Sequence, residues 1–226
     1  MVINLGSFLL KIRNLPSKFL QRHFYFFKSN FKNQSATKKP SVCFIDLDGT
    51  LWPDKIPNQI MKIGKPSREA SFTLNYLRAQ FDYVIAVSNQ TIHAKSNHFG
   101  FLALVRYLLK LLSIRANFLL DGFLICHHHQ NAQNLNLRTS CPYRKPFHRM
   151  MADFELKMPF DKSKSIMIGD RLSDVAVGNF CGLRQTYLIV EDYSLEKIVS
   201  DISWPDTFFF TPIRTISEVV EFEIGI

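Results

Sequence analysis

The sequence predicts an α/β fold in which helices cover both faces of a mostly parallel, Rossmann-like central sheet. Short apolar runs of strand length recur along the chain, and longer stretches with helical periodicity separate them. Continuous apolar runs are typical of parallel strands that are buried on both faces. Acidic or polar residues directly follow several of these runs, which is where sites form in such sheets.

Strands and helices are expected to alternate from Ser41 onward. The expected strands are Val42–Asp46, Tyr83–Ser88, Phe123–Cys126, Ser165–Gly169 and Thr186–Val190. The expected helices lie near Ser67–Gln80, Asn97–Ser113, Phe147–Lys157, Leu172–Phe180 and Ser194–Ser200. The connection from Asp46 to Ser88 is short, so it leaves no room for a large cap domain.

Residues 1–40 are predicted to be a basic, Phe-rich extension and linker, and residues 41–226 a single domain. Within the extension, residues 1–32 have the pattern of an amphipathic helix that Pro16 interrupts. One interpretation is a poorly ordered extension. The other is a membrane-surface anchor or transit peptide formed by residues 1–39.

The positive charge of the chain is concentrated in this extension. The formal net charge is +9, but residues 1–39 hold eight Lys and Arg and no acidic residue, which leaves 20 basic against 19 acidic residues in the remainder. Gripping a nucleic-acid backbone needs a basic groove, so no nucleic-acid partner is expected. The four cysteines, the lack of a signal peptide of ordinary build and the lack of an apolar run of roughly 18–20 residues favour a cytoplasmic protein.

The run Phe44–Thr50 places two carboxylates after the first expected strand. Asp46 and Asp48 are one residue apart and precede Gly49, so both can converge on one cation where the strand ends. With Mg²⁺ present, Asp46 is suited to attack phosphorus while Asp48 handles the proton of the leaving group. Such a run alone also occurs in turns and calcium loops.

Two further motifs offer groups that suit a phosphate. The run Val87–Gln90 lies at the end of the second expected strand, where the Ser88 hydroxyl and the amides that follow it, from Asn89 onward, can donate to phosphoryl oxygens. Arg144 and Lys145 precede a helix that Pro146 can begin. Lys145 can neutralise a phosphate, and Arg144 offers a fork for a second anionic or sugar-oxygen contact.

The fourth motif places carboxylates where a strand ends and a helix begins. Asp170 and Asp174 are four residues apart, and Arg171 between them is a candidate substrate contact. Asp170 is placed to bind Mg²⁺ directly, and Asp174 to orient the ion or its waters. Alternatively, Asp170 or Asp174 simply caps the helix.

These four motifs, in this order over about residues 41–220, resemble the haloacid dehalogenase (HAD) superfamily of aspartate-nucleophile phosphatases, and its subfamily III. The resemblance implies that Asp46 is the nucleophile and Asp48 the general acid/base. It also implies that Ser88 and Lys145 hold the phosphate. Mg²⁺ would be bound by Asp46, the Asp48 carbonyl and Asp170.

A loop before Lys145 resembles the zinc loop of the D-glycero-D-manno-heptose 1,7-bisphosphate phosphatases and the related histidinol-phosphate phosphatases. That loop has the pattern Cys-x-His … Cys-x-Cys, and Cys126, His128 and Cys141 match its first three positions. The fourth position is Tyr143, a poor zinc ligand. Two outcomes stay open: zinc held with the help of His127 or His129, or a loop that has lost its zinc.

The leading hypothesis is therefore a monomeric, Mg²⁺-dependent phosphomonoesterase that acts on a small phosphorylated sugar, most simply of the heptose bisphosphate type. Its substrate would be selected by residues 52–66, residues 91–98 and the insert from Cys126 to Tyr143. The alternative enzymes are a histidinol-phosphate phosphatase and a polynucleotide 3′-phosphatase, whose motifs are similar. The non-enzymatic alternative is a catalytically silent module that binds a phosphorylated ligand.

Overall fold

The computed structural model describes residues 24–26, 38–51, 68–90, 120–133, 135–190 and 208–225. The rest of the N-terminal extension, the expected helices at 97–113 and 194–200, and the predicted selectivity segments 52–66 and 91–98 lie outside these residues. In the part of the chain that the structure describes, no helix is long and apolar enough to cross a membrane.

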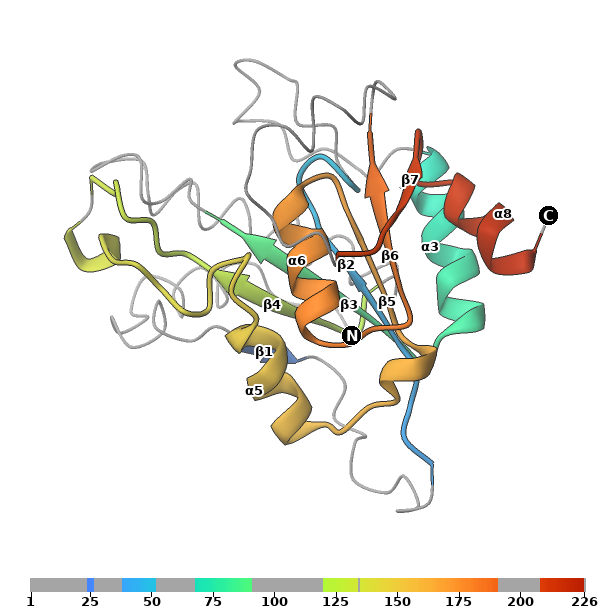
Figure 1. The fold of residues 1–226 in the computed structure, drawn as a ribbon, viewed down its shortest axis with the longest axis horizontal. Coiled ribbons are helices and arrows are strands. Elements are labelled where there is room, and N and C mark those ends of the chain that lie inside the picture. The colour runs from blue at the N-terminus through green and yellow to red at the C-terminus, as the bar shows by residue number, and fades with distance from the viewer. Residues whose placement is uncertain are drawn as a thin grey trace, which may run out of the picture.

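A seven-stranded sheet forms the centre of the protein (Figure 1). Its strand order is β1-β4-β3-β2-β5-β6-β7, and all neighbours are parallel except β1 and β4. The parallel strands are β2 (Val42–Ile45), β3 (Tyr83–Asn89), β4 (Gly122–Cys126), β5 (Ile166–Gly169), β6 (Gln185–Ile189) and β7 (Thr211–Ile213). The first five match the predicted strands to within a residue, which confirms the predicted α/β class.

Strand β1 (Phe24–Phe26) contradicts the amphipathic helix predicted across residues 1–32. It pairs antiparallel with β4, with Tyr25 opposite Phe123. An unpaired β4 would expose a row of main-chain donors and acceptors at the sheet edge, and three consecutive aromatic residues have high strand propensity. Pairing with this edge therefore outweighs the helical spacing of the apolar residues.

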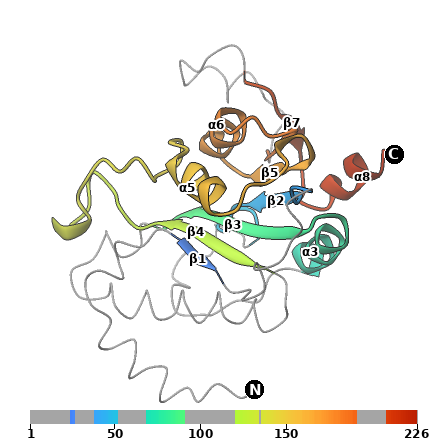
Figure 2. The same cartoon turned by 90° about the horizontal axis from the view of Figure 1, so that it is seen from below.

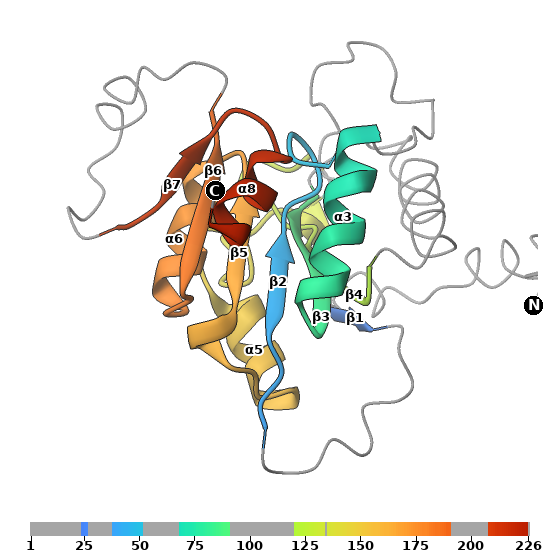
Figure 3. The ribbon, with the colours of Figure 1, turned by 90° about the vertical axis from the view of Figure 1, so that its right-hand side faces the viewer.

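Helices cover both faces of the sheet, as predicted (Figures 2 and 3). Helices α3 (Arg68–Gln80) and α8 (Glu218–Ile224) pack on one face, and α5 (Arg149–Lys157) and α6 (Leu172–Phe180) on the other. Alternate residues of β2 divide between the two cores: Cys43 and Ile45 join the first, and Val42 and Phe44 the second. Two 3₁₀ turns, Leu135–Leu137 and Lys162–Lys164, complete the described elements.

The parallel arrangement brings the predicted motifs to one edge of the sheet. Asp46 directly follows β2, Ser88 and Asn89 end β3, Cys126 ends β4, and Asp170 directly follows β5. Because parallel strands end on the same side, residues that are far apart in the sequence meet there. The Asp46 amide donates to Ile168 O at 2.9 Å, which extends the pairing of β2 with β5 into the site.

Candidate active site

A buried lysine lies at the centre of the site, between two carboxylates. The Lys145 Nζ atom is 2.7 Å from Asp46 Oδ1 and 2.5 Å from Asp174 Oδ1, and it also donates to Val87 O at 2.7 Å. All three charged side chains are nearly inaccessible to solvent. The arrangement fixes the candidate nucleophile against a cation, and its three contacts use all three N–H donors of the ammonium.

The pKa values of this cluster follow from burial and from its mutual charges. Burial lowers the pKa of Lys145, but the Asp174 and Asp46 carboxylates outweigh it, and the pKa of the ammonium is raised. Burial raises the pKa of Asp174 to about 6; Lys145 opposes this change and the Asp46 charge adds to it. Lys145 therefore stays charged at neutral pH.

Asn89 holds the main chain of Lys145 in place. Its Nδ2 atom donates to Lys145 O, and its Oδ1 atom accepts from Lys145 N, both at 2.9 Å. This pair of bonds connects the end of β3 to the segment before α5. The sequence predicted Asn89 only as a substrate contact, which stays a prediction, and it gave no sign of this bracing role.

Gln90 connects Asp48 to the end of β3; the sequence placed this residue in the second motif but assigned it no role. The Gln90 Nε2 atom donates to Asp48 Oδ2 at 2.5 Å and to Ser88 Oγ at 2.9 Å. Ser88 and Gln90 are both buried. The structure thus brings the predicted acid/base and the predicted phosphate-holding hydroxyl to the same amide nitrogen.

Asp170 and Asp174 join Asp46 in a cluster of carboxylates. One ligand atom from each lies within 4.8 Å of the others. Asp174 also accepts from the Arg171 amide at 3.1 Å and so caps α6, which makes it both a helix cap and part of the cluster. Arg171 is exposed, with its Nε atom 3.8 Å from Asp170 Oδ2.

Glycine at position 49 allows Asp170 to approach this closely. Gly49 has φ +86°, a left-handed conformation that favours glycine, and a Cβ atom at this position would collide with the Asp170 carboxylate. The main chain at Gly49 therefore leaves room for the Asp170 carboxylate in this cluster. Carboxylate oxygens in such a group are the ligands that Mg²⁺ prefers.

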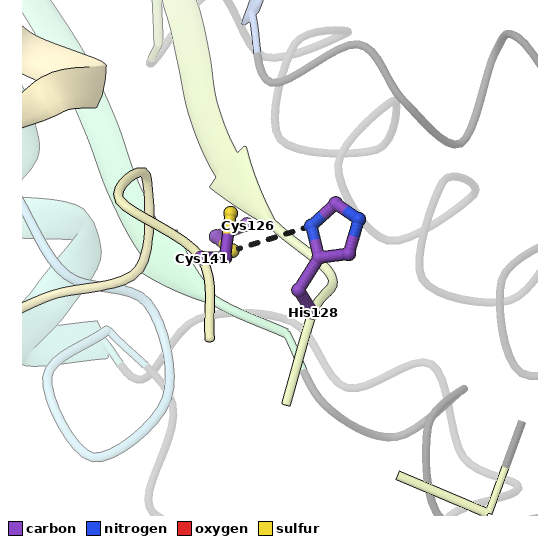
Figure 4. A group of neighbouring side chains, drawn as sticks. All are labelled: Cys126, His128 and Cys141. Carbon is purple, nitrogen blue, oxygen red and sulfur yellow. Dashed lines mark hydrogen bonds between the residues drawn. The ribbon is translucent and has the colours of Figure 1, made fainter. Parts of the chain in front are cut away.

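Cys126, His128 and Cys141 form a second group beside the site (Figure 4). Their ligand atoms lie within 4.8 Å of one another, and Cys126 Sγ is 3.9 Å from His128 Nδ1. Burial, and then the nearby Cys141, raise the pKa of Cys126 to about 12, and burial lowers the pKa of His128. Arg144 Nη1 donates to His128 O at 3.1 Å, so this group contacts a predicted substrate residue.

Tyr143 does not join the cysteine group. Its hydroxyl donates to Asp153 Oδ2 on α5 at 2.6 Å, and Arg149 Nε lies 2.8 Å from the other oxygen of Asp153. The Nδ1 atom of His129 accepts from the Asn131 amide. Among the described residues, no fourth His, Cys, Asp or Glu therefore completes the three-ligand group.

Comparisons with known proteins agree on one family. A family model described as HAD-hydrolase-like matches residues 142–206. The D-glycero-β-D-manno-heptose-1,7-bisphosphate 7-phosphatase of Mesorhizobium japonicum is 30% identical over 180 residues, which cover 78% of this chain and 77% of that enzyme. The enzyme of the same name from Photorhabdus laumondii is 33% identical over 70 residues, or 31% of this chain and only 37% of the relative.

A solved structure agrees with these sequence matches. The D,D-heptose 1,7-bisphosphate phosphatase of B. bronchiseptica, complexed with magnesium and phosphate, has a TM-score of 0.60 and 17% identity, and the match covers 82% of this chain and 98% of that one. At this identity the likeness shows the fold. Together with the Mesorhizobium relative, it places the chain in the HAD superfamily of phosphatases, hydrolases of phosphate esters, where it resembles the heptose bisphosphate phosphatases.

Proposed function

We propose that this phosphatase depends on Mg²⁺ and removes phosphate from a small phosphorylated sugar of the heptose bisphosphate type, through an aspartyl phosphate on Asp46. The observation that carries this proposal is the buried contact of Lys145 with Asp46 and Asp174, next to Asp48 and Ser88. A carboxylate nucleophile needs cations to offset its repulsion from an anionic substrate; Lys145 supplies one, and the carboxylate cluster would hold Mg²⁺ as the second.

The carboxylate group fits a Mg²⁺ ion. Asp46, Asp170 and the main-chain carbonyl of Asp48 are the proposed ligands, and Gly49 admits the Asp170 carboxylate. Asp174 is committed to Lys145 and to the α6 cap, so we assign it an orienting role. When bound, Mg²⁺ offsets the repulsion between these carboxylates and the phosphate. The magnesium in the B. bronchiseptica structure supports this assignment.

The proposed reaction has two chemical steps, and side chains of this protein act in both. In the first step, an oxygen of Asp46 bonds to phosphorus as the ester P–O bond breaks, and Asp48 gives its proton to the leaving oxygen. Lys145 exchanges one of its three contacts for a phosphoryl oxygen, and the Ser88 hydroxyl donates to another. In the second step, water attacks phosphorus and Asp48 takes up its proton. Inorganic phosphate then leaves and the Asp46 carboxylate is restored.

Two arginines at the site support a substrate with a second anionic group. Arg144 is half-buried, and burial lowers the pKa of its guanidinium. Cys126 partly opposes this change, and the nearby charge of Arg171 lowers the pKa further. Two guanidinium groups close enough to repel each other gain from an anion that binds between them. A sugar bisphosphate supplies such an anion, in line with the names of the relatives.

For zinc, the described residues offer an incomplete site. A closed structural zinc site has four N or S ligands, whereas Cys126, His128 and Cys141 supply three and Tyr143 is engaged with α5. We assign zinc no part in the reaction and expect less than one equivalent in untagged protein. Metal analysis with a Cys141→Ser control measures this. One equivalent that the control loses would show that a residue outside the described segments completes the site.

A substrate screen tests the proposed function. Phosphate release is measured with Mg²⁺ or EDTA from heptose 1,7-bisphosphate, histidinol phosphate and a 3′-phosphorylated oligonucleotide. We expect Mg²⁺-dependent turnover of the bisphosphate, and a loss of roughly 10⁴-fold or more in Asp46→Asn. The matched control is Asp161→Asn, which changes a carboxylate at the opposite end of the sheet, on a residue whose main-chain amide donates to Pro40 O.

Different results of the screen contradict different parts of the proposal. Activity that survives Asp46→Asn contradicts the nucleophile, and turnover of only histidinol phosphate or the oligonucleotide contradicts the substrate class. An Arg171→Met variant tests the bisphosphate argument, because we expect it to raise KM about tenfold for a bisphosphate and to leave KM for a sugar monophosphate unchanged. Equal changes for both substrates would contradict it.

A further inference from the structure

We propose that Gln90 is a positioning residue that sets the hydrogen positions of Asp48 and Ser88 at once. The inference rests on the proposed phosphatase mechanism, and it gives a role to a motif residue to which the sequence assigned none. A glutamine amide nitrogen carries two hydrogens and cannot accept a hydrogen bond. In this site its two contacts, to Asp48 Oδ2 and to Ser88 Oγ, are within hydrogen-bonding distance.

Both the main chain and the side chain of Gln90 are fixed. Its amide donates to Cys126 O at 2.8 Å, one residue beyond the last paired residues of β3 and β4, Asn89 and Cys126. Its side chain is 4% exposed, so solvent does not replace its contacts. A side chain that is buried and anchored in this way offers donors at positions that hardly vary.

The contact with Ser88 decides where the hydroxyl hydrogen points. Because Nε2 only donates, Ser88 Oγ must accept from it. The single hydroxyl hydrogen of Ser88 then points away from Gln90, and it can be donated to a phosphoryl oxygen. Without Gln90, this buried hydroxyl has other orientations, and binding a phosphate must first select one of them.

The contact with Asp48 decides which oxygen carries the catalytic proton. Asp48 Oδ2 accepts from Nε2, and because the carbonyl oxygen of a carboxylic acid is a better acceptor than its hydroxyl oxygen, this contact favours the proton on Oδ1. As a general acid, Asp48 then carries its proton on Oδ1 and delivers it from there to the leaving oxygen. The geometry assigns Gln90 the task of holding that oxygen in a productive direction throughout both steps.

The test uses substrates that differ in how much they need a general acid. We would measure kcat/KM for a series of aryl phosphates from p-nitrophenyl phosphate, which has a good leaving group, to phenyl phosphate, which has a poor one. Gln90→Met keeps the size of the side chain and removes both donors. We expect kcat/KM to fall about 10-fold on the first substrate, through Ser88, and about 10³-fold on the last, through the added loss of proton transfer.

Four controls separate positioning from a general loss of structure. Gln80→Met makes the same change at an exposed residue of α3 and should leave kcat/KM unchanged across the series. In an Asp48→Asn background, Gln90→Met should no longer steepen the dependence on the leaving group. Gln90→Met should lose some thermal stability, because two buried acceptors lose their donor, but it should stay fully folded at the assay temperature. Gln90→Asn, with a shorter amide, should not restore the activity.

The outcomes are distinct from those that test the proposed function. If Asp46→Asn retains turnover of the aryl phosphates, the phosphatase mechanism fails. If that variant is inactive but Gln90→Met lowers kcat/KM equally for every leaving group, or not at all, the positioning role is overturned while the mechanism stands. A steeper dependence that persists in the Asp48→Asn background would also overturn it.

Discussion

Replacing Lys145 with Met is expected to destabilise the fold as well as abolish turnover. The ammonium group is buried and is shared by Asp46 and Asp174. Methionine fills a similar volume but leaves the two carboxylates buried without their cation. The free energy of unfolding of this variant therefore measures how much the fold depends on the Lys145 charge.

The magnitude follows from the distances. With Nζ at 2.7 Å from Asp46 and at 2.5 Å from Asp174, each contact provides about 6 kcal/mol of Coulomb attraction at an effective dielectric constant of about 20. The cost of desolvating the ions cancels much of this attraction. Removing one partner of a buried ion pair nevertheless costs about 3–5 kcal/mol, because the other charge stays buried. We expect the free energy of unfolding to fall by that amount.

Urea denaturation in EDTA, followed by far-UV circular dichroism, measures this loss. The matched control is Lys164→Met, which breaks a surface ion pair with Asp161 and should cost about 1 kcal/mol or less. Adding Asp174→Asn to Lys145→Met should recover part of the loss, since one buried charge is removed. A Lys145→Met protein that unfolds within 1 kcal/mol of the wild type would refute the reasoning.

Three further predictions concern Gly49, Glu69 and Tyr143. Gly49→Ala should lower kcat/KM more than about tenfold, because its Cβ meets Asp170, whereas Gly182→Ala, also left-handed but with open space around it, should change only stability. Burial raises the pKa of Glu69, but hydrogen bonds from Ser217 and Thr215, just before α8, outweigh it and lower the pKa below 4.5. The stability that Glu69 contributes is therefore lost as the pH falls through the folded value. Glu69→Gln should flatten that fall in acid thermal melts. Tyr143→Phe should cost about 1 kcal/mol of stability in thermal denaturation without changing metal content.

Residues that directly follow buried strands could be predicted from the sequence. Asp46, Ser88 and Asp170 each come after a short apolar run, and the ends of parallel strands meet at one edge. Lys145 belongs to no strand, but its place in the order of motifs indicated it. The convergence of these side chains therefore required only the class of the fold and the positions of its strands.

The remaining features depend on contacts that a linear pattern does not encode. Gln90 has the same chemistry as any polar residue after a strand, and only its distances to Asp48 and Ser88 distinguish it. Strand β1 depends on the exposed edge of β4, which is distant in the sequence. The direction of the Tyr143 hydroxyl depends on α5 and the carboxylate that it carries.

One strand end connects the two halves of the site. Cys126 supplies a thiol to the cysteine group, and its carbonyl accepts the hydrogen bond that anchors Gln90. The cysteine group also contacts Arg144 through His128 O. A change that moves the main chain at Cys126 therefore reaches both Asp48, through the Gln90 amide, and the proposed substrate contact. We expect the loop to affect turnover through these main-chain bonds, whatever metal it holds. This gives a physical reason for the hydrogen bond from Tyr143 to Asp153 on α5, in a loop that lacks a fourth zinc ligand.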